Sequence, residues 1–268
     1  MHEDDLTRLA FATELIREAG VVALGYHGRL STLTVNSKGV QDVVSEADVA
    51  VENHLKGRLA DRFPTDAFLG EETGHADVPG RTGIWVVDPI DGTQPFVSGL
   101  PTWCISMAYV RDGAVLLGLV LNPVADELFT GGDGVPATLN GDPVQPHPGR
   151  SLADGLTYLG YSPRVGSDRI VAVLDRLLRA GGMFVRNGSG ALGLCDVACG
   201  RLVGYVEPHI NSWDCLGAVA VLQAAGVRVS DFLAGDGLLL GNPIVAGPPA
   251  VYDELVAVLG DARRPAAP

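Results

Sequence analysis

Apolar residues recur at a helical period in several segments of the chain. Residues 4–27 show this spacing and predict an amphipathic helix. Residues 45–62 predict a second helix, for which Ser45 is a candidate N-cap and Asp48, three residues later, comes close to a capping-box pattern. The same reasoning predicts three helices in the second half of the chain, at 167–179, 190–199 and 214–225.

Short apolar runs between turn residues predict strands. Residues 84–87 form one such run. Residues 104–110 and 114–121 flank Arg111-Asp112-Gly113, so that they predict a β-hairpin. Further strands are predicted to end at Leu69 and to lie at 127–130 and 202–206.

The order of these elements predicts two layered halves. Residues 131–150 are rich in Gly, Pro, Asn and Asp, and a domain boundary is predicted near 145. Residues 1–145 then form an α+β domain. Residues 146–268, where helices and strands alternate, form an α/β domain.

Composition narrows the function. The net charge of −13 over 268 residues leaves no basic stripe for nucleic acid, but a small phosphorylated substrate stays compatible if bound cations invert the local field. No apolar run approaches the roughly 18 residues of a membrane span, and the acidic N-terminus does not resemble a signal peptide. Reduced, buried thiols are expected in a cytoplasmic protein, at Cys104, Cys195, Cys199 and Cys215.

The stretch WVVDPIDGTQPFVSGLP, residues 85–101, holds the first candidate chemistry. An apolar run leads directly into Asp88 and Asp91, three residues apart. A solvated turn is one interpretation, since Asp-Pro and Asp-Gly are common turn pairs. The other is a cation site, because two neighbouring carboxylates repel each other unless they are protonated or bridged by cations, and Mg²⁺ prefers carboxylate oxygens.

The residues around these two acids suit a phosphate ester. The Ile90 carbonyl could face a metal, and Gly92 lets the backbone approach an anion. Thr93 is predicted to start a helix, whose free N–H groups suit a phosphate. The haloacid-dehalogenase phosphatases have a similar tetrad, but their acids lie two apart and near the N-terminus, so that family is rejected.

Two further acidic positions are candidate partners. Glu71 and Glu72 follow a predicted strand end, and alone they indicate an exposed acidic turn. Asp214 precedes an apolar helix, and alone it indicates an N-cap. Together with Asp88 and Asp91, in this order along the chain, they make a far more specific pattern of convergent metal ligands.

That ordered set resembles the inositol monophosphatase family, the Mg²⁺-dependent, lithium-sensitive phosphatases. The resemblance runs through SKGVQDVVSEAD (37–48), FLGEE (68–72), WVVDPIDGT (85–93), LNGDPV (139–144), GSGALGLCDVACGRLVGYVE (188–207) and SWDCLGAVAVLQAAG (212–226). It implies an αβαβα sandwich of the sugar-phosphatase type, two or three Mg²⁺ ions per subunit and a homodimer.

The resemblance also implies roles for single residues. Glu71, Asp88 and the Ile90 carbonyl match the ligands of a first Mg²⁺. Asp88, Asp91 and Asp214 match those of a second, and a third ion leans again on Glu71. Thr93 with Glu71 matches the pair that orients the attacking water, supported by Asp48. The implied substrate contacts are Gly92, Thr93, Gly188, Ser189, Gly190, Glu207 and Asp214.

The sequence departs from the family pattern outside the predicted metal ligands. Lys38 lies one residue closer to Asp48 than the family's lysine, and a solvated loop lysine is the alternative. Gln94-Pro95 replaces a more usual Thr/Ser-Asn. Gly190 and Gly193 stand where Ala and Asp are more typical. The departures concern the substrate pocket, so the chemistry is better defined than the specificity.

The predicted function is Mg²⁺-dependent hydrolysis of a small phosphorylated polyol, above all inositol monophosphate, by a metal-activated water. DGTQPFVSGLP (91–101) also resembles the histidinol-phosphate phosphatase branch, where Arg186, Asn187 and His209 could recognise substrate; an ordinary loop histidine is the alternative for His209. Two further alternatives are a catalytically silent, metal-binding dimer and a nucleotide-bisphosphate phosphatase. The second would want a basic pocket, and few of the 19 Lys and Arg residues lie near the motifs.

Overall fold

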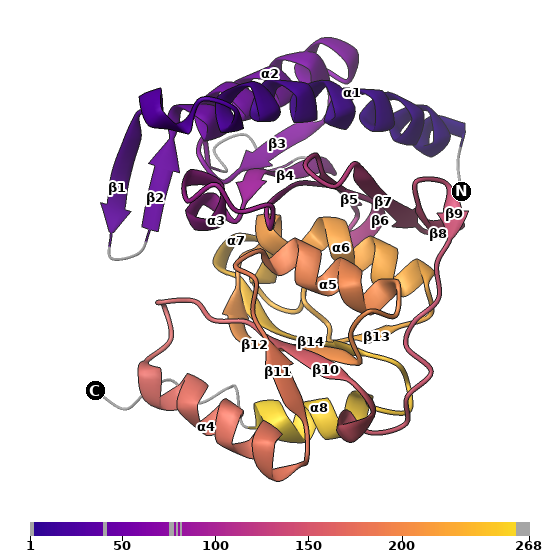
Figure 1. Ribbon diagram of the computed structural model, residues 1–268. Coiled ribbons are helices and arrows are strands. Elements are labelled where there is room, and N and C mark those ends of the chain that lie inside the picture. Colours follow the sequence, from indigo (N-terminus) through magenta and orange to yellow (C-terminus); the bar gives the residue numbers. More distant parts are fainter. Residues whose placement is uncertain (1–2, 40–41, 75–77, 79, 81, 261–268) are drawn as a thin grey trace.

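The chain folds into five alternating layers of helices and sheets (Figure 1). The computed structural model describes residues 3–39, 42–74, 78, 80 and 82–260. The predicted αβαβα fold class is confirmed. None of the helices within these residues is both long enough and apolar enough to cross a membrane. The helical layers are the pairs α1 (Glu3–His27) with α2 (Glu46–Arg62), α5 (Gly190–Ala198) with α6 (Ser212–Ala224), and α4 (Ser167–Arg179) with α8 (Tyr252–Leu259).

The first sheet has seven strands in sequence order, β3 to β9. The first two strands are parallel and all later neighbours are antiparallel. The predicted hairpin is confirmed as β5 and β6. No strand was predicted within 131–150, but the chain forms β8 and β9 there, with β9 at the sheet edge. The strands are β3 (Ala67–Gly70), β4 (Gly83–Asp91), β5 (Cys104–Arg111), β6 (Ala114–Asn122), β7 (Glu127–Gly132), β8 (Val135–Leu139) and β9 (Asp142–Pro143).

The second sheet has the order β11-β10-β12-β14-β13, with parallel pairs around β10 and antiparallel pairs around β14. Its strands are β10 (Leu156–Leu159), β11 (Met183–Val185), β12 (Gly204–Ile210), β13 (Arg228–Val229) and β14 (Asn242–Gly247). The remaining elements are the hairpin β1 (Val35–Gly39) and β2 (Asp42–Ser45), with the short helices η1 (Leu30–Thr32), α3 (Thr93–Val97), η2 (Leu152–Asp154) and α7 (Gly237–Leu240).

Strand β4 is apolar from Ile84 to Val87 because both its faces are buried there. Ile84 and Val86 face the core between the sheets, whereas Trp85 and Val87 face the core under α1 and α2. The strand was predicted to end at Val87, but it continues to Asp91. Its pairing with β5 shifts register between Asp88 and Asp91. A bulge of this kind re-aims side chains and lets the two acids remain inside the sheet.

Helix α6 lies in the middle layer and carries Asp214 to the first sheet. It is buried almost all round, as expected for a helix without a polar face. Two glycines let it approach the strands: a Cβ on Gly217 would lie 2.6 Å from Ser106 Oγ, and one on Gly118 would overlap the Gly217 carbonyl. The core between the sheets therefore draws on both predicted domains, and their division near 145 stays a prediction.

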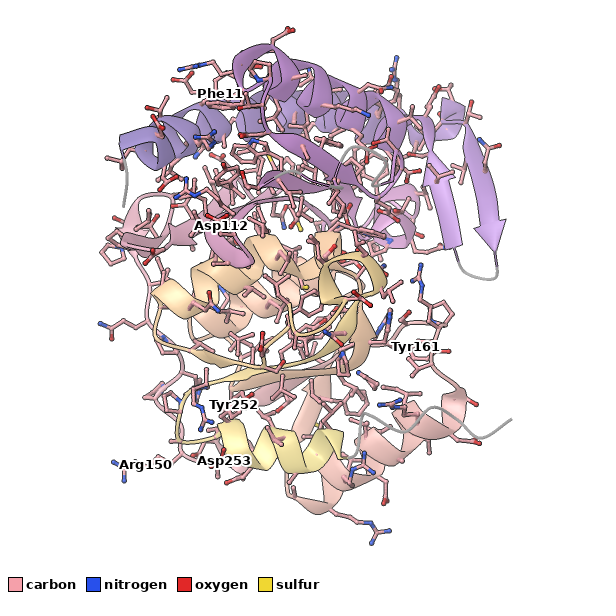
Figure 2. All side chains as sticks on the ribbon, turned by 180° about the vertical axis from the view of Figure 1, so that it is seen from behind. Phe11, Asp112, Arg150, Tyr161, Tyr252 and Asp253 are labelled. Atoms are coloured by element: carbon pink, nitrogen blue, oxygen red, sulfur yellow. The ribbon has the colours of Figure 1, made fainter. Side chains whose placement is uncertain are left out.

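The outer layers cover the free faces of both sheets. Figure 2 shows Phe11 in the layer of α1 and α2, and Tyr252 and Asp253 in the layer of α8. All four cysteines are free thiols; Cys104, Cys195 and Cys215 are buried, as predicted, whereas Cys199 is only half-buried.

Candidate metal centre and substrate cleft

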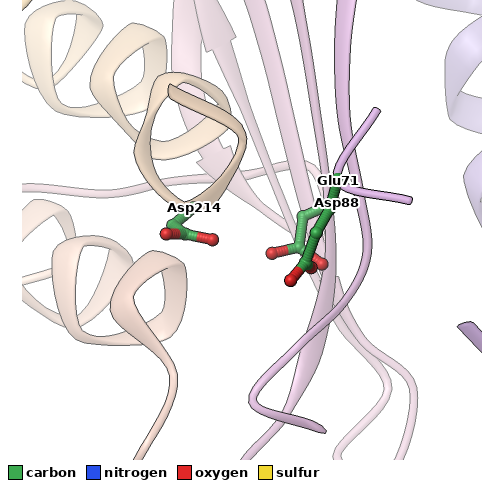
Figure 3. Close-up of side chains that lie close together, drawn as sticks. All are labelled: Glu71, Asp88 and Asp214. Atoms are coloured by element: carbon green, nitrogen blue, oxygen red, sulfur yellow. The ribbon is translucent and has the colours of Figure 1, made fainter. Parts of the chain in front are cut away.

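Three carboxylates from distant parts of the chain converge beside the first sheet (Figure 3). Glu71 follows β3, Asp88 lies within β4 and Asp214 lies in the first turn of α6. One oxygen from each side chain lies within 4.8 Å of the other two. Figure 3 shows the Asp214 carboxylate facing the other two across the gap between helix and strand.

Backbone pairing and a helix cap place these three side chains. The Glu71 N–H donates to the Val87 carbonyl at 3.3 Å, which brings Glu71 beside Asp88. Asp214 closes a capping box with Asn211, whose backbone N–H and side-chain amide both donate to Asp214 Oδ2 at 3.2 and 3.0 Å. The N-cap interpretation of Asp214 and its place in the acidic cluster thus hold together.

The electrostatics of the cluster fit a cation. Burial raises the pKa of Asp88 well above its ordinary value, and repulsion from Glu71, Asp91 and Asp214 raises it further. Burial also raises the pKa of Asp214, against the opposing hydrogen bonds from Asp88 and Asn211. The solvated-turn interpretation is wrong, because Asp88 is 1% exposed and Asp91 is 7% exposed. A divalent cation would relieve this crowding of buried negative charge, and an all-carboxylate donor set suits Mg²⁺.

Asp91 lies next to this cluster but is turned toward the start of α5. Its carboxylate accepts hydrogen bonds from Ser189 Oγ at 2.6 Å, the Ala191 N–H at 2.7 Å and the Gly190 N–H at 3.3 Å. Burial and the charge of Asp214 raise its pKa to about 7 against these bonds. Asp91 is not one of the three acids that meet in the described residues, so its role as a metal ligand stays a prediction.

Thr93 connects the cluster to the first turn of α2. Its hydroxyl donates to Asp48 Oδ1 at 3.2 Å or to the Ile90 carbonyl at 3.3 Å. Asp48 closes the predicted capping box, because its Oδ2 accepts from the N–H and the Oγ of Ser45 at 2.8 and 2.6 Å. Burial raises the pKa of Asp48 to about 6, although the bonds from Ser45 oppose it.

The turn before α3 needs a glycine. Gly92 has φ of +97°, in the left-handed region, and a Cβ there would lie 3.1 Å from the Thr102 carbonyl. Gly188 also has φ of +97°, and its Cβ would lie 2.6 Å from Pro95 Cγ. The unusual Pro95 therefore packs directly against the predicted substrate loop.

A cleft of about 540 Å³ opens beside the cluster. A larger hollow of about 810 Å³ lies between β6–β8 and α6, and no residue of the acidic cluster lines it. The smaller cleft is therefore the candidate active site. Its lining includes most of the predicted site residues, namely Glu71, Asp91, Gly92, Thr93, Gly188, Gly190, Glu207 and Asp214. Ser189 is buried behind Asp91, and burial raises the pKa of Glu207 to about 8.

Of the three residues proposed for substrate recognition, two line the cleft and His209 does not. Arg186 and Asn187 line the cleft, together with Arg164. His209 is not a loop histidine; it lies on β12, outside the cleft lining, and its Nε2 is 3.0 Å from the Leu240 carbonyl oxygen. The side chain of Lys38 lies outside the described residues.

Other contributors were missed from the sequence. Glu52 accepts the N–H groups of Glu72 and Thr73 at 3.0 and 2.8 Å, and so fixes the turn that carries Glu71. A Cβ on Gly70 would overlap this carboxylate. Both Glu71 and Glu72 are half-buried, which argues against an exposed acidic turn. In the sequence Glu52 is only a polar residue on a predicted helix. It is 1% exposed, and this burial depends on the tertiary fold.

Comparison with known proteins was informative over nearly the whole chain. A model of the inositol monophosphatase family matches residues 4–263. Inositol monophosphatase 3 of Solanum lycopersicum is 34% identical over 266 residues, with 94% of this chain and 96% of that protein covered. A Haemophilus influenzae protein named Nus factor SuhB is 31% identical over 251 residues, with 92% and 94% covered. The solved IMPase of Thermotoga maritima has a TM-score of 0.83 at 28% identity, with 96% of this chain and 98% of that chain covered.

Proposed function

We propose that this chain, which belongs to the inositol monophosphatase family, hydrolyses the phosphate ester of a small phosphorylated polyol with the help of Mg²⁺. Inositol monophosphate is the leading candidate substrate. The observation that carries the proposal is the convergence of Glu71, Asp88 and Asp214 at the edge of a cleft large enough for such a substrate.

The acidic cluster would hold the cation. Glu71, Asp88 and Asp214 supply carboxylate oxygens, and Asp91 and the Ile90 carbonyl are the further ligands that the family resemblance implies. Mg²⁺ held by these residues would neutralise charge on the phosphoryl oxygens and lower the pKa of water. Two or three ions per subunit, and inhibition by lithium, belong to the same proposal.

Thr93 and Asp48 would orient the attacking water. The Thr93 hydroxyl hydrogen is engaged by Asp48 or by the Ile90 carbonyl, so that an oxygen lone pair can accept a hydrogen bond from water in the cleft. Glu71 lies in the lining of the same cleft. Held in this way, the water would be aimed at the phosphorus, and positioning would supply much of the rate.

Binding of the ester would use several residues of the cleft. Gly92 and Thr93 line the cleft, and their backbone N–H groups would suit phosphoryl oxygens. Arg164 and Arg186 line the cleft too and would add positive charge for the phosphoryl group. Glu207 would hydrogen-bond hydroxyls of the leaving group, because a carboxyl group accepts through its oxygens and, when protonated, also donates.

The remaining parts of the proposal concern the cellular compartment, the oligomeric state and the class of substrate. The family resemblance favours a cytoplasmic homodimer, and free thiols suit a reducing compartment. The net charge of −13 favours a small-molecule substrate over nucleic acid.

The test is a phosphate-release assay on the purified chain with and without Mg²⁺. Inositol 1-phosphate, histidinol phosphate, fructose bisphosphate and adenosine 3′,5′-bisphosphate are the substrates, and a chelator provides the metal-free control. The proposal expects Mg²⁺-dependent release that is fastest with inositol 1-phosphate. A preference for histidinol phosphate would move the chain to that branch, and no release from any ester would make it a silent relative.

Asp88→Asn is the diagnostic variant. Loss of one metal ligand is expected to cost about 4 kcal/mol of transition-state stabilisation, or about 10³-fold in rate. Asp133→Asn, at an exposed turn between β7 and β8, is the matched control and should keep full activity. Circular dichroism of both variants checks that the fold is retained. Normal turnover by Asp88→Asn would refute the proposed metal site.

A further inference from the structure

Two tyrosines form a buried, stacked pair under the cleft. Tyr158 on β10 and Tyr205 on β12 are register partners in the parallel pairing of these strands. Their ring centroids are 4.8 Å apart and the ring planes differ by 4°. Tyr158 is 2% exposed and Tyr205 is 0% exposed, yet both belong to the lining of the cleft. A buried tyrosine keeps its hydroxyl only where that hydroxyl has a partner.

Tyr205 directs its hydroxyl at Glu207. The two residues are two apart on β12, so their side chains leave the same face of the strand. The Tyr205 hydroxyl donates a hydrogen bond to Glu207 Oε2. Glu207 is 5% exposed and also lines the cleft. The bond therefore fixes one oxygen of the carboxylate that faces the substrate space.

Tyr158 forms hydrogen bonds with the loop at 187–189, which borders the cleft. Its hydroxyl donates to Asn187 Oδ1 at 3.0 Å and accepts from the Gly188 N–H at 3.2 Å. Asn187 Oδ1 also accepts the Ser189 N–H at 3.0 Å. The loop that borders the cleft is thus tied to the ring on which Tyr205 stacks.

Three glycines leave the space that this arrangement needs. A Cβ on Gly193 would lie 2.5 Å from Tyr158 Cδ2, and one on Gly190 would lie 3.3 Å from the Tyr205 hydroxyl. A Cβ on Gly160 would overlap Glu207 Oε2. Gly190 and Gly193 are two of the positions where the sequence departs from the family pattern. The two glycines that depart from the family pattern therefore leave the space that the two tyrosines occupy.

We propose that Tyr205, held in place by its stack on Tyr158, is a positioning residue that aims Glu207 at hydroxyl groups of the leaving alcohol. The proposal rests on the function proposed above and deepens it, because it assigns the preference for a hydroxylated leaving group to these residues. The reaction at phosphorus is assigned to other residues of the cleft, Glu71, Thr93 and Asp214. Loss of the Tyr205 hydroxyl should therefore weaken recognition of a polyol phosphate and spare an ester without hydroxyls.

The test compares two substrates in Tyr205→Phe. Inositol 1-phosphate carries hydroxyls on its leaving group, and p-nitrophenyl phosphate carries none. The hydrogen bond to the Glu207 carboxyl group supports a loss of roughly 3- to 10-fold in kcat/KM for inositol 1-phosphate, mainly through KM. With p-nitrophenyl phosphate the change should stay below about twofold. Tyr252→Phe, on α8 in the outer layer of Figure 2 and outside the cleft lining, is the matched control.

Glu207→Gln and the double variant keep the test decisive if Tyr205→Phe folds poorly. Glu207→Gln should show the same substrate-selective loss. The double variant should lose no more than either single variant, because both act through one carboxylate. Equal losses with both substrates, no loss with either, or additive losses would overturn the role of Tyr205. If the unmodified chain hydrolyses p-nitrophenyl phosphate but not inositol 1-phosphate, the proposed preference for a hydroxylated leaving group is refuted while phosphatase activity stands. If it hydrolyses neither ester, the proposed function itself is refuted.

Discussion

Replacing Glu207 with glutamine removes a charge that the fold buries at a cost in stability. Burial is the largest cause that raises the pKa of Glu207 from 4.5 to about 8, and the charges of Asp214 and Asp91 add to it. The Tyr205 hydroxyl and the charge of Arg186 oppose the rise only in part. The folded protein therefore holds the proton on Glu207 more tightly than the unfolded chain does.

The sign of the pH dependence follows from this difference. Below the unfolded pKa of 4.5, both states are protonated and Glu207 costs no stability. Between 4.5 and about 8 the unfolded chain releases the proton while the folded state keeps it, so that the stability of the protein falls as pH rises. Above about 8 both states are ionised and the full cost is present. Glutamine cannot ionise and escapes this cost.

The magnitude comes from the two pKa values. Their difference, at about 1.4 kcal/mol for each pH unit, gives a full cost of about 5 kcal/mol. From about pH 5 to about pH 9, the advantage of Glu207→Gln over the unmodified protein should grow by about 4 kcal/mol. The altered hydrogen bond with Tyr205 adds an offset of about 1 kcal/mol that does not vary with pH.

Urea unfolding measures this advantage directly. Free energies of unfolding are determined for both proteins in chelator at several pH values, and the difference is plotted against pH. Glu14→Gln, exposed on α1, is the matched control and should give a difference near zero throughout. A flat difference for Glu207→Gln would refute the reasoning, because Glu207 would then bind its proton equally well in both states.

Three further substitutions test how the site is held. Ser189→Ala removes the 2.6 Å hydrogen bond to Asp91, and should raise the Mg²⁺ concentration for half-maximal phosphate release about tenfold; an unchanged Mg²⁺ dependence would contradict the role of Ser189. Ser45→Ala removes the N-cap of α2, and should lower stability by about 1–2 kcal/mol in urea unfolding. Gly217→Ala puts a Cβ 2.6 Å from a β5 side chain, and should cost about 1–3 kcal/mol; unchanged unfolding would show that α6 can move away.

The sequence predicted the elements whose signals are local. Helices α1, α2, α4, α5 and α6 carry helical periodicity, and the capping box of α2 is written in Ser45 and Asp48. The β5–β6 hairpin follows from two apolar runs around Asp112, which adopts φ of +52° in the turn labelled in Figure 2. These patterns depend on neighbours in the chain, so that a single sequence is enough to read them.

The elements that were missed depend on distant contacts. Strand β9 is the pair Asp142-Pro143, typical of a loop, and only its pairing with β8 at the sheet edge makes it a strand. Strand β8 has apolar Val135, Ala137 and Leu139, but it lies in a stretch rich in turn residues that hides this pattern. The extension of β4 to Asp91 needs β5 as a partner. The hydrogen bonds of these strands come from a partner strand, so the local sequence pattern does not predict them.

The candidate site divides in the same way. Three of the predicted metal ligands, Glu71, Asp88 and Asp214, meet in the structure. The sequence could predict them because each acid lies in a recognisable short pattern with Gly, Thr or Trp. Glu52, Tyr158 and Tyr205 have no motif of their own. Their contributions appear only when the second sheet and the turn after β3 are brought against the acids.

The most direct test of the central claim is a crystal of the unmodified chain soaked in Mn²⁺, with anomalous differences used to locate the ion. The account predicts an anomalous peak enclosed by oxygens of Glu71, Asp88 and Asp214, and no such peak in Asp88→Asn. Well-ordered carboxylates with no peak between them would contradict the account.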